Sequence, residues 1–227
     1  MTHAASIARL GRNRCLFLAL AAGAVNAIAL LGFNHQGVSH LSGISTQIGI
    51  DVSTTNFSAA THLGLMVLSF ALGASISGLV VGSEPLKLRR GYSVCLFGEA
   101  ALLLGAMWLL GGGSIAGQYI AAAACGLQNA MTSTFTGAVV RTTHVTGIIT
   151  DLGVSFGLWL RGESAGQRRL VICLVLIAGF ILGGLVGALS FGWWGYNGLV
   201  LPAVVILLMG LASLLLPSGN ISAAVSQ

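Results

Sequence analysis

Charged residues are scarce in this chain of 227 residues, where Asp, Glu, Lys and Arg together make up only 7%. Soluble domains carry about 25% charged residues, and a water-facing surface with far fewer would expose apolar patches large enough to aggregate. Hydrophobic residues make up 56% of the chain. The composition therefore excludes an ordinary soluble domain and predicts a surface that faces lipid.

The sequence signatures of metal sites and of common hydrolytic enzymes are missing as well. The four cysteines have no CxxC or metal-type spacing, which supports neither a disulfide framework nor a zinc site. No HExxH, Ser-His-Asp arrangement, paired carboxylates or glycine-rich phosphate loop is recognisable. The net charge of +5 is spread over small basic groups with no aromatic and basic face between them. We therefore expect no enzyme activity, no cofactor, no metal and no nucleic-acid partner.

Six apolar runs are long enough to cross a bilayer, which takes about 20 mostly apolar residues. They lie near residues 15–33, 60–82, 92–111, 114–136, 169–190 and 196–216. The first run follows a basic flank, as in a signal peptide, but it is longer than a signal core of about 7 to 15 residues, so we expect it to be retained. The sequence thus predicts an all-α polytopic membrane protein, a single integral domain over residues 1–227 whose surroundings are the lipid bilayer.

The basic residues predict the orientation of these helices. Lys and Arg precede the first run and lie between the second and third and between the fourth and fifth, whereas the other three connections contain neither. Because short cytoplasmic loops carry an excess of Lys and Arg, both termini are predicted to be cytoplasmic. The three groups are Arg9, Arg12 and Arg14; Lys87, Arg89 and Arg90; and Arg141, Arg161, Arg168 and Arg169.

An internal repeat divides the chain into two related halves. The pattern Ser/Thr-His-Leu/Val-Ser/Thr-Gly-Ile occurs at residues 39–44 and again at 143–148, and the likeness continues to residues 49 and 153. The repeat predicts one three-helix unit over residues 15–111 and a second over 114–216. Further matches pair Asn26-Ala27 with Asn129-Ala130, Phe70 and Gly73 with Phe180 and Gly183, and Gly91-Tyr92 with Gly195-Tyr196.

Because three is an odd number, the second unit must enter the membrane from the opposite side. The halves then form an inverted repeat, an architecture common among secondary transporters with a solute site near the bilayer midplane. Small residues also recur every four positions, as they do where membrane helices pack closely. Such seams are Gly179, Gly183 and Gly187, together with Gly73 with Ser77, Ala74 with Gly78, and Gly78 with Gly82.

The motif segments, residues 34–59 and 141–168, are too long and too polar for simple turns. We expect them to dip into the bundle, with Gly43 and Gly147 as places where a helix breaks. The alternatives are that Ser and Thr bond the carbonyl one turn back, that the histidines are packing residues, and that the amides join helices. The candidate solute ligands are Asn26, His40, Ser42, Gly43, Thr46, Gln128, Asn129, His144, Thr146, Gly147 and Thr150.

Four charged residues are candidates for proton transfer or gating. Glu99 stands about 10 Å into the third apolar run at 1.5 Å per residue, and carboxylates inside membranes are functional candidates. It either carries a proton or is a neutral carboxyl bonded to a neighbouring helix. Asp51, Asp151 and Arg141 flank the motifs, where they either gate them or are simply solvated.

The chain resembles the YoaK-like family of bacterial membrane proteins, which is defined by a domain of unknown function. The segments that carry the resemblance are AGAVNA at 22–27, SHLSG at 39–43, ACGLQNA at 124–130 and RTTHVTGIITDLG at 141–153. The resemblance implies a six-helix, multi-pass protein of the bacterial inner membrane. It implies no substrate and no reaction.

The repeat and its polar motifs favour a secondary transporter or permease of an unidentified small solute, with the polar site near mid-membrane. A six-helix unit is small for alternating access, which favours a homodimer. Two alternatives stay open. One is a non-catalytic membrane subunit or sensor, and the other is an intramembrane enzyme acting on a lipid or isoprenoid, with His40, His144 and Glu99 as acid or base groups.

Overall fold

The computed structural model describes residues 3–33, 35–81, 85–135, 142–163 and 167–215, with side chains for 12–33, 35–81, 91–133, 142–163 and 170–215. Within these ranges the chain forms helices joined by short connections and contains no strand. Four stretches of the described chain are long and apolar enough to cross a membrane: Arg12–Gly32, Phe57–Val81, Gly91–Gly111 and Leu170–Leu215. The chain is therefore an all-helical protein with the apolar helices of a membrane protein, as its composition predicted.

Each of the six predicted runs coincides with a helix, although the chain is not equally apolar along all of them. The last stretch of 46 residues holds two helices, which a short 3-10 helix, η1 (Gly195–Leu199), separates. The fifth helix in the chain is not among the four apolar stretches, because it carries amides and hydroxyls from Gln118 to Ser133. The helices are α1 (His3–Gly32), α3 (Phe57–Val81), α4 (Pro85–Gly111), α5 (Ala116–Phe135), α7 (Gln167–Trp194) and α8 (Val200–Leu215).

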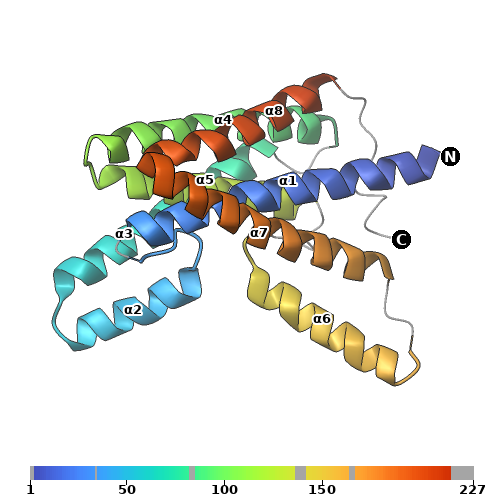
Figure 1. Ribbon diagram of the computed structural model, residues 1–227, viewed down its shortest axis with the longest axis horizontal. Coiled ribbons are helices and arrows are strands. Elements are labelled where there is room, and N and C mark those ends of the chain that lie inside the picture. Colours follow the sequence, from blue (N-terminus) through green and yellow to red (C-terminus); the bar gives the residue numbers. More distant parts are fainter. Residues whose placement is uncertain (1–2, 34, 82–84, 136–141, 164–166, 216–227) are drawn as a thin grey trace.

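The motif segments each contain a short helix, α2 (Leu41–Ser53) and α6 (Val145–Leu160). Both begin near the middle of the long axis of the molecule, and they run from there toward opposite ends (Figure 1). His40 and His144 are the N-cap residues. The segments thus dip into the bundle as predicted, but Gly43 and Gly147 lie within the first helical turn and do not break a helix.

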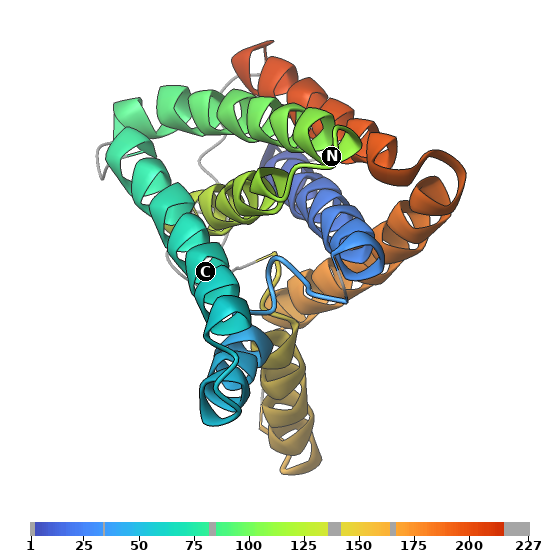
Figure 2. The same ribbon diagram turned by 90° about the vertical axis from the view of Figure 1, so that its left-hand side faces the viewer.

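Viewed along its long axis, the molecule has α1 and α5 at its centre (Figure 2). The helices α3, α4, α8 and α7 surround them, and α2 and α6 both lie at the open face between α3 and α7, each in its own half of the long axis. Because α2 follows α1 and α6 follows α5, each central helix leads directly into a short helix. This arrangement brings the two motif segments to the same place from distant parts of the sequence.

Close backbone contacts join each central helix to a helix of the other half of the chain. A Cβ atom at Gly23 of α1 would overlap the carbonyl oxygen of Phe180 in α7. A Cβ atom at Gly126 of α5 would likewise overlap the carbonyl oxygen of Phe70 in α3. Only glycine, which has no side chain, permits backbones to approach this closely. Gly23 and Gly126 stand three residues before Asn26 and Asn129, so these two contacts correspond in the repeat.

A second pair of contacts follows the same relation. Gly183 of α7 lies against the carbonyl group of Leu20 in α1, and Gly73 of α3 lies against the carbonyl group of Ala123 in α5. In α7, the predicted seam of Gly179, Gly183 and Gly187 faces α1 along its length. The predicted pairs that include Gly78 form no seam within the described chain, because a Cβ atom there would meet no atom within 4 Å. Gly82 lies outside the described residues.

Basic side chains gather at one end of the molecule. Arg12 and Arg14 belong to the first part of α1, and Arg161 follows α6. These two helix ends lie at the same end of the long axis in Figure 1. The connections at the opposite end, residues 54–56, 112–115 and 195–199, contain no Lys or Arg. Arg141 and the side chains of Arg9, Lys87, Arg89, Arg90, Arg168 and Arg169 lie outside the described part of the chain.

Candidate functional site

Asn26 of α1 holds the segment that leads into α2. The side chain is only 2% exposed, and its Oδ1 accepts a hydrogen bond from the Ser39 hydroxyl at 3.0 Å. Its amide nitrogen lies 3.2 Å from Nδ1 of His40. Because an amide nitrogen only donates, Nδ1 is the acceptor and the ring proton is assigned to Nε2. The buried amide therefore fixes both the position and the tautomer of the N-cap histidine.

Asn129 of α5 plays the corresponding part in the second half. Its amide nitrogen donates to the Thr143 hydroxyl, and the Thr142 hydroxyl donates to its Oδ1 at 3.3 Å. Thr143 is the counterpart of Ser39 in the repeat, so each asparagine bonds the residue directly before an N-cap histidine. The two amides thus satisfy their hydrogen bonds between separate segments, as the interhelical alternative required, and they also shape the site.

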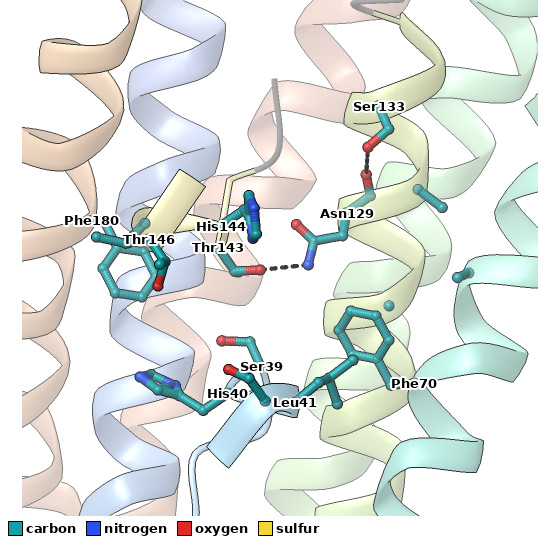
Figure 3. A pocket seen from close by; sticks show the side chains of 15 residues that line it. Ser39, His40, Leu41, Phe70, Asn129, Ser133, Thr143, His144, Thr146 and Phe180 are labelled. Atoms are coloured by element: carbon teal, nitrogen blue, oxygen red, sulfur yellow. Dashed lines mark hydrogen bonds between the residues drawn. The ribbon is translucent and has the colours of Figure 1, made fainter. Parts of the chain in front are cut away.

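A cavity of about 740 Å³ lies where α2 and α6 begin. Figure 3 shows the start of each short helix facing the other across this space, with Phe70 on one side and Phe180 on the other. The lining comes from both halves of the chain. It consists of Ser39, His40, Leu41, Ser42, Phe70, Ala74, Gly126, Asn129, Ala130, Ser133, Thr143, His144, Val145, Thr146 and Phe180.

Five of the predicted ligands line this cavity: His40, Ser42, Asn129, His144 and Thr146. Asn26 lies behind the lining and acts through the hydrogen bonds described above. The other predicted ligands, Gly43, Thr46, Gln128, Gly147 and Thr150, are not among the lining residues.

Three of those outlying residues have clear structural roles. The hydroxyls of Thr46 and Thr150 donate to the carbonyl oxygens of the residues one turn back, each at 3.0 Å. The Gln128 amide donates across helices to the carbonyl oxygen of Leu18 at 3.0 Å. The sequence pattern of the motifs could not distinguish the first turn of α2 and α6, which meets the cavity, from the second turn, which is exposed on the outer face.

The two histidines occupy corresponding positions but have different surroundings. The His40 ring turns back toward α1 and bonds Asn26. The His144 ring instead lies over the first turn of its own helix, where a Cβ atom at Gly147 would overlap ring atoms. At Gly43, the counterpart of Gly147, a Cβ atom would meet nothing within 4 Å. The cavity lining therefore departs from two-fold symmetry at its histidines.

Sequence reasoning missed several lining residues, most of which are small or apolar. Phe70 and Phe180 form opposite walls, and their pairing in the repeat was a signal that they occupy matching places. Some of the remaining ones belong to the repeat motif or to its further matches, but nothing in the sequence identified any of them as facing a cavity. These are Ser39, Leu41, Ala74, Gly126, Ala130, Ser133, Thr143 and Val145.

The three predicted proton and gating residues that the structure describes are not among the residues that line the cavity. Glu99 of α4 is 2% exposed, and its Oε2 has no hydrogen-bond partner among the described residues. Asp51 of α2 accepts a hydrogen bond from the Gln47 amide at 3.1 Å, one turn away on the same helix. Asp151 is half-buried in α6, and Arg141 lies outside the described residues. No acidic side chain is thus among the described residues that line the cavity.

Comparison with known proteins places the chain in a family without assigning an activity. The family model described as "Protein of unknown function (DUF1275)" matches residues 15–212 and so includes the whole cavity lining. This match confirms the family resemblance drawn from the motifs. No curated protein and no solved structure matches the chain. Function must therefore be argued from the cavity itself.

Proposed function

The chain belongs to the DUF1275 family, whose function is unknown, and from that premise we propose that it is a secondary transporter or permease of a small solute. The observation that carries the proposal is the cavity of about 740 Å³ between the starts of α2 and α6. Its volume lies in the range of small-molecule sites, about 300–1,000 Å³, and it combines apolar walls with a few polar groups. The two repeat motifs meet there, and this site would bind the solute.

We propose further that the six long helices span the membrane as two inverted three-helix repeats, residues 15–111 and 114–216. The paired contacts support this, since Gly23 with Phe180 and Gly126 with Phe70 are related by the repeat. The opposite directions of α2 and α6 also support it (Figure 1). Two such halves can exchange their conformations. The exchange provides outward-open and inward-open states that are structurally equivalent.

The difference between the two histidines supports alternating access. In one half, the N-cap histidine is bonded to the central helix, and in the other it is not. The lining likewise includes α5 residues such as Gly126 and Asn129 but not their α1 counterparts Gly23 and Asn26. Exchange of the two arrangements would make α1 residues line the cavity in place of the α5 residues.

The basic end of the molecule supports an orientation with both termini in the cytoplasm. Arg12, Arg14 and Arg161 lie at this end, and short loops rich in Lys and Arg stay on the cytoplasmic side. For a bacterial protein, the bilayer concerned is the inner membrane. The α2–α3 connection would then face outward and the α6–α7 connection inward.

We also propose that two copies of the chain associate. The outer faces of α2 and α6 are exposed and carry small residues, among them Gly49 and Gly153, where a Cβ atom would meet nothing within 4 Å. In lipid, such faces favour close packing against another helix. The cavity lies beside these helices, so a second copy would limit the access of lipid to it.

The two other functions receive less support. A membrane subunit or sensor would have motif residues bonded to one another around no cavity, whereas five predicted ligands line a cavity here. An intramembrane enzyme with His40, His144 and Glu99 as acid or base groups requires the three to meet. Glu99 is buried in α4 and does not line the cavity with the histidines.

The test is uptake into proteoliposomes that contain the purified full-length protein, measured against a panel of radiolabelled metabolites. We expect at least one solute to accumulate or exchange, and we expect His40→Ala and His144→Ala each to slow it at least tenfold. The matched control is His62→Ala, because His62 bonds Tyr119 at 2.7 Å away from the cavity. If no solute moves, or if all three variants behave alike, the transport proposal is wrong.

A further inference from the structure

The beginnings of α2 and α6 leave backbone donors without partners. In α2 the first amide that bonds the turn before it is that of Ile44, which donates to the carbonyl oxygen of His40 at 3.0 Å. In α6 the corresponding bond runs from Ile148 to His144 at 3.2 Å. Neither N-cap histidine makes a capping hydrogen bond. The amides of residues 41–43 and 145–147 therefore have no partner within the described part of the chain.

These free amides point from both helices toward the same cavity. Figure 3 shows the two helix starts on either side of it, with the N-cap residues His40 and His144 each beside the start of its own helix. The aligned peptide dipoles place roughly half a positive charge at each helix start. A single helix start does not define a ligand site. Here two of them face one another across a space of about 740 Å³, and their partial charges repel unless a negative group lies between them.

The side chains of the lining add donors and no negative charge. Because Nδ1 of His40 accepts from Asn26, the ring proton on Nε2 is free to donate. The Thr143 hydroxyl accepts from Asn129, so its own proton is also free to donate. No acidic residue is among the described residues that line the cavity. Such an inventory of donors favours an anion over a cation or a neutral solute.

The size and walls of the cavity narrow the class of anion. A volume of about 740 Å³ far exceeds that of an inorganic ion, for which a much tighter cage would suffice. Phe70 and Phe180 stand on opposite sides of the space, where their rings can contact an apolar body (Figure 3). The polar groups lie between these walls, at the helix starts. The shape therefore fits a solute with one anionic group and a small apolar body.

We infer that the cavity binds a small organic anion, with its carboxylate held between the starts of α2 and α6 and its apolar part between Phe70 and Phe180. This inference rests on the proposed function, because it names the substrate class of the same site. It concerns binding, however, and binding can be measured without transport. Soluble anions and the headgroups of anionic lipids share the same charge, and the inference is for the soluble anion.

The first experiment measures ligand-induced changes in melting temperature and calorimetric binding for the full chain in neutral detergent. The probes are benzoate, hexanoate, succinate and inorganic phosphate, with benzamide, hexanamide and choline as neutral and cationic counterparts. Benzoate or hexanoate is expected to bind at least tenfold more tightly than its amide. Equal binding of acid and amide, a preference for choline, or a response only to phosphate or to phosphatidylglycerol would overturn the inference.

The second experiment places a negative charge at the helix starts. Ser42→Asp and Thr146→Asp are each compared with the asparagine variant of the same position, since the two side chains differ in charge and hardly in size. Each aspartate variant is expected to melt at a higher temperature than its asparagine partner and to bind benzoate at least tenfold more weakly. The two positions are tested separately, so a folding failure at one leaves the other informative. Equal binding in both pairs would overturn the inference.

The results separate this inference from the proposed function. If uptake of a neutral or cationic solute is found and carboxylates do not bind, the anion inference is wrong and transport stands. If carboxylates bind but no solute crosses the liposome membrane, the binding site stands and transport is wrong.

Discussion

At the scale of single residues, two asparagines do most to shape the cavity. Asn26 and Asn129 stand in helices surrounded by apolar residues, where an unbonded amide would cost several kcal/mol. Each one instead bonds the residue before an N-cap histidine, Ser39 in one half and Thr143 in the other. The cost of burying an amide is thereby offset by bonds that hold a short helix with its amino end in the bundle.

Replacing Asn26 with leucine should destabilise the protein. The Asn26→Leu variant keeps the side-chain volume but removes the hydrogen bonds to Ser39 and His40, each of which contributes about 0.5–1.5 kcal/mol. We expect a lower midpoint of thermal unfolding in detergent. Asn13→Leu is the control, because Asn13 is exposed near the start of α1. Equal unfolding midpoints for the two variants would mean that Asn26 does not hold α2 in place.

Glu99 presents the opposite case, a buried polar group with an unused hydrogen-bond acceptor. Because its Oε2 has no partner in the described part of the chain, Glu99→Gln should leave the unfolding midpoint unchanged or raise it. Gln128→Leu removes the 3.0 Å bond to Leu18 and should lower the midpoint. Circular dichroism melting in detergent compares the two variants. A fall of several degrees for Glu99→Gln would reveal a partner for the carboxyl group.

The same substitution tests whether Glu99 carries a proton. If it does, proteoliposomes with Glu99→Gln should still exchange labelled solute for unlabelled solute, but they should no longer concentrate it in response to a pH gradient. Exchange needs only the cavity, which Glu99 does not line, whereas accumulation needs the titratable group. Unchanged accumulation would exclude Glu99 as the coupling residue.

At the scale of helices, the contacts between halves depend on glycine. Gly126 of α5 and Gly23 of α1 lie so close to the carbonyl groups of Phe70 and Phe180 that a methyl group cannot fit without backbone movement. Phe70 and Phe180 also line the cavity. The helix seams and the cavity walls therefore share residues, so a shift of one helix along its seam changes the shape of the site.

Alanine at these glycines should separate the helices. Gly126→Ala places a methyl group against a carbonyl group that belongs to helix backbone, and we expect a loss of at least about 2 kcal/mol, comparable with an overpacked core. Gly78→Ala in α3 meets open space, so it should be neutral or stabilise the helix by about 0.5–1 kcal/mol. Thermal unfolding of both variants in the same detergent compares them. Similar losses would show that α5 does not pack closely on α3.

The sequence was sufficient to predict the helices but was less informative about which side chains contact one another. Apolar runs placed the six long helices, because a run of about 20 mostly apolar residues is typical of a helix that can span a bilayer. The repeat identified both motif segments and the asparagines that hold them. It could not show that His40 bonds Asn26 whereas His144 does not bond Asn129, because that difference depends on packing between distant helices. Gly43 and Gly147 were expected at helix breaks, but both lie in the first helical turn, since each helix begins after its N-cap histidine.

At the scale of the whole molecule, the proposed inverted repeat makes a prediction about the two sides of the membrane. The turn that follows α2 and the segment that follows α6 lie at opposite ends of the long axis (Figure 1). Arg161 lies at the end with the other described arginines, and the α2–α3 turn lies at the end without basic residues. The two motifs should therefore be exposed, beyond their short helices, to opposite compartments.

Cysteine labelling can test this directly. Ser58 at the start of α3 and Glu163 after α6 are both exposed, and three of the four native cysteines are buried, so the unmodified chain gives the background. A membrane-impermeant maleimide should label Ser58→Cys in intact spheroplasts and Glu163→Cys only in inside-out vesicles. Ser114→Cys, in the α4–α5 connection, should behave like Ser58→Cys because both lie at the end without Lys or Arg. Labelling of Ser58→Cys and Glu163→Cys from the same side would show that the second half does not enter the membrane oppositely to the first, and alternating access between equivalent halves would then have no structural basis.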